Sequence, residues 1–369
     1  MRGFLLIFLC LALGVLAWGE GIVIPLPEGT GGISLAWASE GRALGVVYLD
    51  GYYLRVRILE VPGGGLRWDK EVGEIPLTNY RPLLCPISFS PDGMLVGVAT
   101  PWGIRVYSTV NGRLVIMYPI DVDSAPLIMK FLHGKDSFPF PYCLGLMVAR
   151  AECWGPPQIA SPSAELTFER RAPSWELDDE VSLGMRPLPL LSAMADFSAD
   201  GKVFAASSMD PDTGEWIWGF LGGEAEEGLY SLAGLLNRTA EPTALAVSPD
   251  GREVTLGLGT DRPGEVPLIW NLDPVSGEEL AAYFPCGKCQ CFVSALDWSP
   301  DGRYLAYSAR AEGYSRLGLI RVETGEDIIL CEAADYASCP ALLPAFSPTG
   351  EFLATLGQRG VLLWPVPGE

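Results

Sequence analysis

Histidine is almost absent from this sequence, in which His133 is the only one among 369 residues. A Ser-His-Asp arrangement needs an imidazole as its general base, so this type of catalysis is disfavoured. The sequence also has no Gly-x-Ser-x-Gly segment, which forms the nucleophile turn of many hydrolases. Any catalysis would therefore depend on carboxylates, and the sequence does not show which of the 45 acidic residues converge in space.

Basic residues are scarce as well. The chain has 25 Lys and Arg against 45 Asp and Glu, which gives a formal net charge of −20, and five of the basic residues are Lys. Proteins that bind nucleic acid or anionic membranes obtain much of their affinity from Lys and Arg at phosphate groups. The composition disfavours both as partners and favours a basic protein or envelope component.

One short segment recurs through the chain. In its complete form an apolar strand ends at Trp298 and is followed by Ser299, Pro300, Asp301 and Gly302. Proline presets φ at the second position of the turn, Ser and Asp can hydrogen-bond to the local backbone, and glycine accepts positive φ. Related copies close at Gly41, Gly93, Gly201, Gly251 and Gly350.

The closing glycines are about 50 residues apart, except for one gap of 108 residues between Gly93 and Gly201. A fixed period of this size is typical of solenoids, propellers and arrays. The doubled gap predicts a seventh, degenerate unit, with residues 130–135 as its turn. The residue four positions after each glycine is small, as in Gly45 and Ala306, which favours closely stacked sheets over a flat array.

Each unit continues into a second hairpin, for example through residues 110–112, 275–277 and 323–325. With these turns the chain resembles the WD-repeat-like β-propeller family, specifically the Ser-Pro-Asp-Gly branch of bacterial exported and envelope propellers. It departs from standard WD repeats in lacking the Gly-His pair, and Trp270-Asn271 replaces Trp-Asp. The resemblance implies an all-β, seven-bladed propeller of four-stranded antiparallel blades. Six blades plus an insertion is the alternative.

The N-terminal segment predicts export. Arg2 precedes an apolar run over residues 4–18, and Ala17 and Gly19 place a cleavage site before Glu20. We expect a signal peptide at 1–19, a periplasmic or extracellular location, and one domain at 20–369. The expected blades are 33–80, 84–125, 126–190, 191–240, 241–290, 291–338, and 339–369 with 20–32. Residues 22–26 are expected to pair beside 361–366 and close the ring.

Cysteine usage agrees with export. Eight cysteines follow the predicted cleavage site, and an even number in an exported chain indicates disulfides, with Cys331–Cys339 as the local candidate. The candidates are Cys85, Cys143, Cys153, Cys286, Cys289, Cys291, Cys331 and Cys339. A metal or redox role for the cluster at 286–291 is the alternative, as is a calcium loop at 210–215. No cofactor or metal is expected.

Residues 137–190 interrupt the repeat and are interpreted as a loop-rich insertion. They combine aromatic residues with an acidic run, as protein interfaces often do. The candidate binding residues are Phe138, Phe140, Tyr142, Trp154, Trp175, Asp178, Asp179 and Glu180. The alternative is that the aromatic side chains pack a decayed blade.

These features predict an exported, monomeric, non-enzymatic propeller that binds a protein or envelope partner. The alternative is a metal-dependent propeller hydrolase, lactonase- or glycosidase-like, with carboxylates around the central channel.

Overall fold

The computed structural model describes part of the chain, and for β10–β13 and β17 it describes the backbone. The described residues are 21–74, 87–100, 103–118, 124–133, 144–154, 163–171, 177–182, 194–198, 203–209, 216–222, 225–231, 240–260, 268–285, 291–311, 314–333, 342–357 and 360–368. In this part every regular element is a β-strand. No helix among these residues has the length and hydropathy to cross a membrane.

The strands form antiparallel sheets that follow chain order. The first contains β2 (Gly31–Trp37), β3 (Ala43–Asp50), β4 (Tyr53–Glu60) and β5 (Leu66–Glu74). The second contains β6 (Ile87–Phe89), β7 (Leu95–Thr100), β8 (Gly103–Ser108) and β9 (Leu114–Tyr118). The third contains β10 (Ser124–His133), β11 (Leu144–Trp154), β12 (Ser163–Arg171) and β13 (Leu177–Ser182). The fourth contains β14 (Met194–Phe197), β15 (Val203–Met209), β16 (Trp216–Gly222) and β17 (Ala225–Ser231).

The next eight strands are joined in one sheet. They are β18 (Ala240–Val247), β19 (Val254–Thr260), β20 (Ile269–Leu272), β21 (Glu279–Tyr283), β22 (Phe292–Trp298), β23 (Tyr304–Ala311), β24 (Tyr314–Arg321) and β25 (Glu326–Ala333). A single residue pair, Gly259 with Phe292, links β19 to β22. The sheet therefore consists of two four-stranded groups, β18–β21 and β22–β25.

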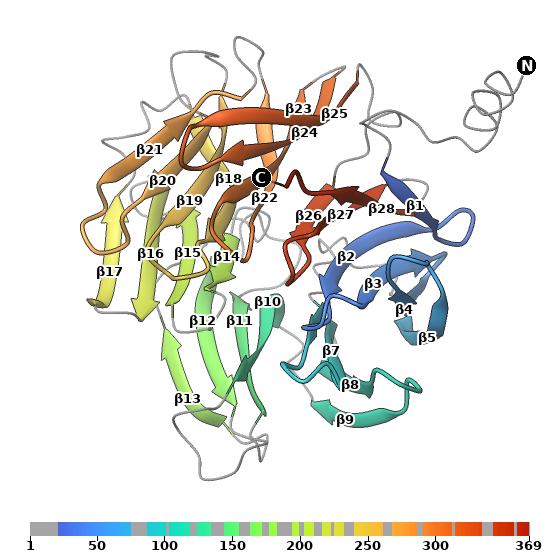
Figure 1. Cartoon of the computed structure of the whole chain (residues 1–369). Coiled ribbons are helices and arrows are strands. Elements are labelled where there is room, and N and C mark those ends of the chain that lie inside the picture. Colours follow the sequence, from blue (N-terminus) through green and yellow to red (C-terminus); the bar gives the residue numbers. More distant parts are fainter. Residues whose placement is uncertain are drawn as a thin grey trace, which may run out of the picture.

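The last sheet joins the two ends of the described chain. β26 (Leu342–Phe346), β27 (Phe352–Gly357) and β28 (Gly360–Pro365) pair in sequence, and β1 (Ile22–Pro25) pairs antiparallel to β28. The register runs from Ile22 opposite Leu363 to Pro25 opposite Gly360. In Figure 1 the first strands of the sheets lie near a common centre and the last strands lie at the periphery.

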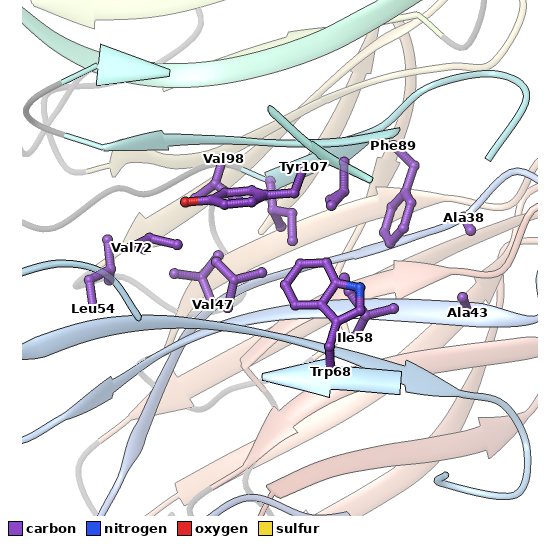
Figure 2. Close-up of a cluster of buried hydrophobic side chains, with 13 residues drawn as sticks. Ala38, Ala43, Val47, Leu54, Ile58, Trp68, Val72, Phe89, Val98 and Tyr107 are labelled. Carbon is purple, nitrogen blue, oxygen red and sulfur yellow. The ribbon is translucent and has the colours of Figure 1, made fainter. Parts of the chain in front are cut away.

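Hydrophobic cores lie between successive sheets. Figure 2 shows the core between the first and second sheets, where Trp68 and Val47 face Phe89 and Tyr107. The rings of Trp68 and Tyr107 lie with their centroids 5.9 Å apart. Comparable cores join β14–β17 to β18–β21, β22–β25 to β26–β28, and the last sheet to the first. At these described junctions, neighbouring sheets bury their faces against each other.

The close approach of the sheets explains the small residues of the repeat. A Cβ added at Gly45 would lie 2.6 Å from Ile87 Cδ1, on the first strand of the next sheet. Ala306 and Ala354, four residues after their closing glycines, are fully buried. The prediction of closely stacked sheets is confirmed at these positions.

The third sheet corrects two sequence interpretations. Residues 130–133, expected to begin the turn of the degenerate unit, belong to strand β10. Residues 144–154, 163–171 and 177–182, assigned to a loop-rich insertion, are three strands of a regular sheet. A short, nearly continuous apolar run, such as residues 125–132 of β10, is consistent with a buried strand whether or not a recognisable turn follows.

Candidate functional site

Each sheet has two ends with different connections. The turns from first to second strand and from third to fourth strand lie together at one end, which we call the turn face; examples are residues 90–94 and 109–113. The backbone N–H of Thr109 donates to Met94 O at 3.0 Å and joins these two turns. The second-to-third turns and the links between sheets lie at the opposite end, the connection face.

The turn face is occupied by the repeated Ser-Pro-Asp-Gly turns. Ser299 Oγ donates to Asp301 Oδ1 at 2.7 Å and accepts from the Tyr304 N–H at 2.8 Å, and Gly302 has φ 71°. Burial pushes the pKa of Asp301 upward, but hydrogen bonds from Ser299 and Arg303 outweigh it, so the pKa lies below its ordinary value. These polar groups act within the turn, as the sequence predicted, and their role is structural.

The first strands of the sheets form the surface around the centre of the ring, which we call the axial surface. Three of these strands carry a one-residue β-bulge at the same register, and the extra residues are Ile33, Thr243 and Ser294. Each is the eighth residue before a closing glycine. Thr243 Oγ1 donates to Val293 O at 2.6 Å, so a bulge side chain connects adjacent first strands.

Exposed side chains on the axial surface come from β18, β22 and β26. Phe292, the first residue of β22, is 41% exposed, and Glu241 near the start of β18 is also exposed. Leu343 on β26 is 38% exposed and has φ 48°, a left-handed conformation that is uncommon for residues other than glycine. Among the first-strand side chains that the structure describes, the exposed ones are therefore two large apolar groups and a carboxylate.

Two carboxylates of the first strands bind backbone rather than facing a ligand. Asp196 Oδ2 accepts from the Val247 N–H at 2.9 Å, and Asp297 Oδ2 accepts from the Phe346 N–H at 2.6 Å. Both residues lie five positions before a closing glycine, and each bond reaches the end of the next first strand. These carboxylates hold adjacent sheets together.

A polar cluster in the first sheet surrounds Asp69 on β5. The hydroxyl of buried Tyr48 donates to Asp69 Oδ2 at 2.6 Å, Arg55 Nε donates to Oδ1 at 3.0 Å, and Arg57 Nε donates to Oδ2 at 2.8 Å. Burial raises the pKa of Asp69, but these three donors outweigh it and hold the pKa below its ordinary value. Arg57 Nη1 also donates to Pro25 O at the end of β1, at 3.5 Å.

A second Tyr-Arg-Asp cluster, with one arginine in place of two, lies in β22–β25. Tyr307 Oη donates to Asp327 Oδ1 at 2.7 Å, and Arg316 Nη2 donates to Oδ2 at 2.7 Å. Here burial raises the pKa of Asp327 above its ordinary value, because the bonds from Tyr307 and Arg316 offset only part of the desolvation. Arg316 Nη1 also donates to Pro285 O, just beyond β21. In both clusters an arginine binds a backbone carbonyl at the outer edge of the preceding sheet.

Comparisons with known proteins agree with this architecture. The family model for the WD domain, G-beta repeat, matches residues 283–317, which include the turn at 299–302. The structure resembles a chain of Kuenenia stuttgartiensis hydrazine synthase, with 13% identity, 92% of this chain and 96% of that chain covered, and a TM-score of 0.62. The fold is that of a WD-repeat-like β-propeller.

Further propeller structures show the same likeness. The WD40 domain of SCAP from fission yeast has 10% identity over 95% of this chain and 98% of its own, with a TM-score of 0.54. A chain of the mitotic checkpoint complex has 12% identity over 95% of this chain and 94% of its own, with a TM-score of 0.57. No curated protein matches the sequence. At these identities the likeness shows the propeller fold alone.

The third blade separates the binding residues expected from the sequence. Trp154 ends β11 and pairs with Ser163, whereas Asp179 pairs with Arg170 at the other end of the same sheet. Arg170 pairs in turn with Met147, which stands seven residues before Trp154 in β11, so Trp154 and Asp179 are about 23 Å apart along the strand at roughly 3.3 Å per residue. Asp178, Asp179 and Glu180 lie in the outermost strand, β13. Phe138, Phe140, Tyr142 and Trp175 lie outside the described residues.

Most candidates for metal or redox chemistry also lie outside the described residues. These are the 210–215 loop and Cys85, Cys143, Cys286, Cys289 and Cys339. Among the residues that the structure does describe, no group of three or more His, Cys, Asp or Glu side chains could hold a metal ion. Cys291 is buried beside β22, and Cys331 lies in β25. The predicted disulfides, Cys331–Cys339 included, stay predictions, as does the signal peptide at 1–19.

Sequence reasoning missed Glu241 and Phe292 on the axial surface. Both stand ten residues before the closing glycine of their unit, as Gly31 does. This offset was available in the sequence, because β2, β18 and β22 have seven, eight and seven residues and end at a similar distance before their turns. Leu343 carries no such signal, since the bulge of β26 lies closer to its turn.

Proposed function

We propose that this chain is an exported, non-enzymatic, seven-bladed propeller that binds a protein partner with a basic contact surface. The described strands divide into seven sets of four, counting β18–β21 and β22–β25 separately. In the last set β1 supplies the fourth strand beside β28. This arrangement supports closure of the ring by the N-terminal strand, because β1 covers the outer edge of β28 and completes the last blade with a strand from the other end of the described chain.

The observation that carries the proposal is the charge of four consecutive outermost strands. β13, β17, β21 and β25 contain carboxylates and no Lys or Arg. We call these carboxylates the acidic arc. Its members are Asp178, Asp179, Glu180, Glu226, Glu227, Glu279, Glu326 and Glu332; Asp327 is left out because Tyr307 and Arg316 bind its carboxylate.

The acidic arc follows one side of the ring. In Figure 1 its four strands occupy successive positions along the periphery, from β13 through β17 and β21 to β25. Glu279, Glu326 and Glu332 are exposed, although Glu326 pairs with Arg321 at 2.7 Å and Glu332 with Arg316 at 3.8 Å, so the unpaired charge of β25 is reduced. A surface of one sign attracts a partner of the opposite sign and suppresses partners of its own sign. The arc therefore supports a basic partner that contacts the outer wall of blades three to six.

The test compares two charge variants of the mature chain. The arc variant replaces Asp178, Asp179, Glu180 and Glu279 by the corresponding amides. The control variant replaces Glu28, Asp50, Glu71 and Glu74 on or beside the first and last blades. Both remove four negative charges, so they differ in the position of the change and not in its size.

Intact protein and both variants are immobilised and exposed to an extract of exported proteins from the source cell. We expect the intact chain and the control variant to retain the same basic proteins, and the arc variant to lose them. Because screening shortens the Debye length from about 10 Å at 0.1 M salt to about 3 Å at 1 M, retention should fall as salt rises. Equal retention by the arc variant would contradict the proposal. Chelator-sensitive hydrolysis of a lactone or glycoside would support the hydrolase alternative instead.

A further inference from the structure

The second blade exposes an unusual concentration of apolar side chains. Met94, Val110, Leu114, Val115 and Met117 are between 46% and 71% exposed, and all belong to one blade. We call these five residues the blade-2 patch. Single exposed apolar residues are normal, but a contiguous group marks an interaction site.

The five side chains are held on one connected piece of backbone. Thr109 Oγ1 donates to Gly93 O at 2.7 Å, and the Thr109 N–H donates to Met94 O at 3.0 Å, so the turn carrying Met94 adjoins the one carrying Val110. That second turn leads directly into β9, which supplies Leu114, Val115 and Met117. In Figure 1 β9 lies at the outer edge of the molecule.

The outer strand of this blade differs from those of the acidic arc. Outer strands of natural sheets usually carry charges that discourage association, and the four strands of the arc do so. β9 has the sequence Leu-Val-Ile-Met-Tyr and contains no charged residue. The patch is therefore a part of the outer wall where charge does not oppose contact.

The border of the patch carries both signs of charge. The Glu40 carboxylate lies against Gly93, and Asp92 precedes that glycine, while Lys70 lies against Gly112, which Arg113 follows. Among the described residues, two acidic and two basic side chains make this part of the border neutral, although the whole chain has a formal net charge of −20. A basic partner has no electrostatic reason to choose this surface over the acidic arc.

We propose that the blade-2 patch binds a second copy of this chain about a two-fold axis. A two-fold interface places the same surface on both copies, so that surface must be complementary to itself. An apolar centre with a border of both signs meets this condition. The acidic arc begins at the third blade and continues away from β9 along the periphery, so this contact brings neutral surfaces together.

The area of the patch limits how tightly two copies can bind. Stable interfaces bury about 800 Å² on each partner, whereas the largest apolar patch of a monomer covers about 300–600 Å². Five side chains that are 46–71% exposed present apolar area on the order of 500 Å², which lies within the monomer range and below the area of a stable interface. The dimer should therefore be weak, with a dissociation constant in the micromolar range.

Salt should strengthen this dimer. Each copy carries a formal charge of −20, and added salt screens the repulsion between them while apolar burial is retained. Binding of a basic partner through the acidic arc should respond in the opposite direction. The two proposals can therefore fail independently.

The test is sedimentation equilibrium of the chain lacking residues 1–19, over a concentration series at low and high sodium chloride. The patch variant is V115K/M117K. The control is L280K/I329K, which changes two residues of similar exposure on β21 and β25. Thermal melting and circular dichroism confirm that both variants fold.

We expect the intact chain and the control to dimerise more strongly at high salt, and the patch variant to stay monomeric under all conditions. An intact chain that is monomeric at several hundred micromolar in high salt would overturn the proposal. So would a patch variant that dimerises as the control does. Capture of basic proteins by the patch variant should be unchanged, whichever result is obtained for the dimer.

Discussion

Replacing Asp69 by Asn should weaken the attachment of the first blade to the strand beside it. Asp69 accepts hydrogen bonds from Tyr48, Arg55 and Arg57, and Arg57 also binds the carbonyl of Pro25 at the end of β1. Asn keeps the shape and one acceptor oxygen but removes the charge. Two partly buried guanidinium groups then lose their counterion.

The magnitude follows from the number and setting of these bonds. A hydrogen bond to a charged group contributes about 1.5–3 kcal/mol, and removing one partner of a buried ion pair costs about 3–5 kcal/mol. The side chains of Arg55 and Arg57 are 27% and 16% exposed, so solvent reduces the cost. We expect a loss of about 3 kcal/mol, which lowers the Tm of a chain of this size by about 4 °C at roughly 2.1 cal/mol/K of unfolding entropy per residue.

The pH dependence gives a second readout. Because the folded pKa of Asp69 lies below its unfolded value, its contribution to stability is present above the unfolded pKa and is lost as pH falls through the folded pKa. The difference between wild type and Asp69→Asn, measured by denaturant unfolding, should therefore shrink on acidification. Glu71→Gln on the same strand is the control and should change stability by less than about 0.5 kcal/mol. Equal stability of Asp69→Asn and wild type at neutral pH would refute this reasoning.

Three further outcomes are expected. Gly318→Ala should lower the free energy of unfolding by about 1–3 kcal/mol through overpacking, because its Cβ would lie 2.5 Å from the buried ring of Tyr307. Gly31→Ala is the control, because no atom lies within 4 Å of its added Cβ, and equal melting temperatures of the two variants would contradict the expectation. Glu253→Gln should be more stable than wild type at neutral pH. Burial raises the pKa of Glu253 in the folded state, so the stability of the wild type falls as pH rises through that pKa. The difference in unfolding free energy between Glu253→Gln and wild type should therefore widen as pH rises, and a constant difference would contradict this expectation. Deleting residues 21–28 should lower the Tm by exposing the edge of β28, and an unchanged melting curve would count against ring closure.

The sequence predicted those parts of the fold that depend on local chemistry. The Ser-Pro-Asp-Gly turns form because Ser, Asp and Gly act within a few residues of one another, and Gly93, Gly251 and Gly302 all adopt positive φ as expected. The sequence of the third blade contains no Ser-Pro-Asp-Gly turn, so no closing glycine marked the end of its first strand. The start of its turn was therefore predicted at residues that belong to β10. The acidic run was interpreted as part of an insertion because charged residues rarely mark a strand, yet 177–182 pairs with β12.

The clusters around Asp69 and Asp327 were beyond sequence reasoning for a different reason. Their members come from three strands of a blade, and the pairing register decides which of them meet. Tyr48 stands seven residues after its closing glycine, whereas Tyr307 stands five residues after its own. The two clusters therefore share chemistry without sharing a position in the repeat, and the period cannot reveal them. The bulges of the first strands were missed because a bulge is defined only by its partner strand.

Most of the polar bonds between neighbouring blades join a side chain on one blade to the main chain of the next. Arg57, Arg316, Asp297 and Thr243 all use a backbone carbonyl or amide as their partner. A main-chain partner is present whatever residue occupies that position. At these positions the neighbouring blade can change its side chain without losing the polar bond, so matching between blades is required only of the apolar residues that pack between them. Co-variation between adjacent blades should therefore be concentrated in these apolar contacts and be weak at the polar ones.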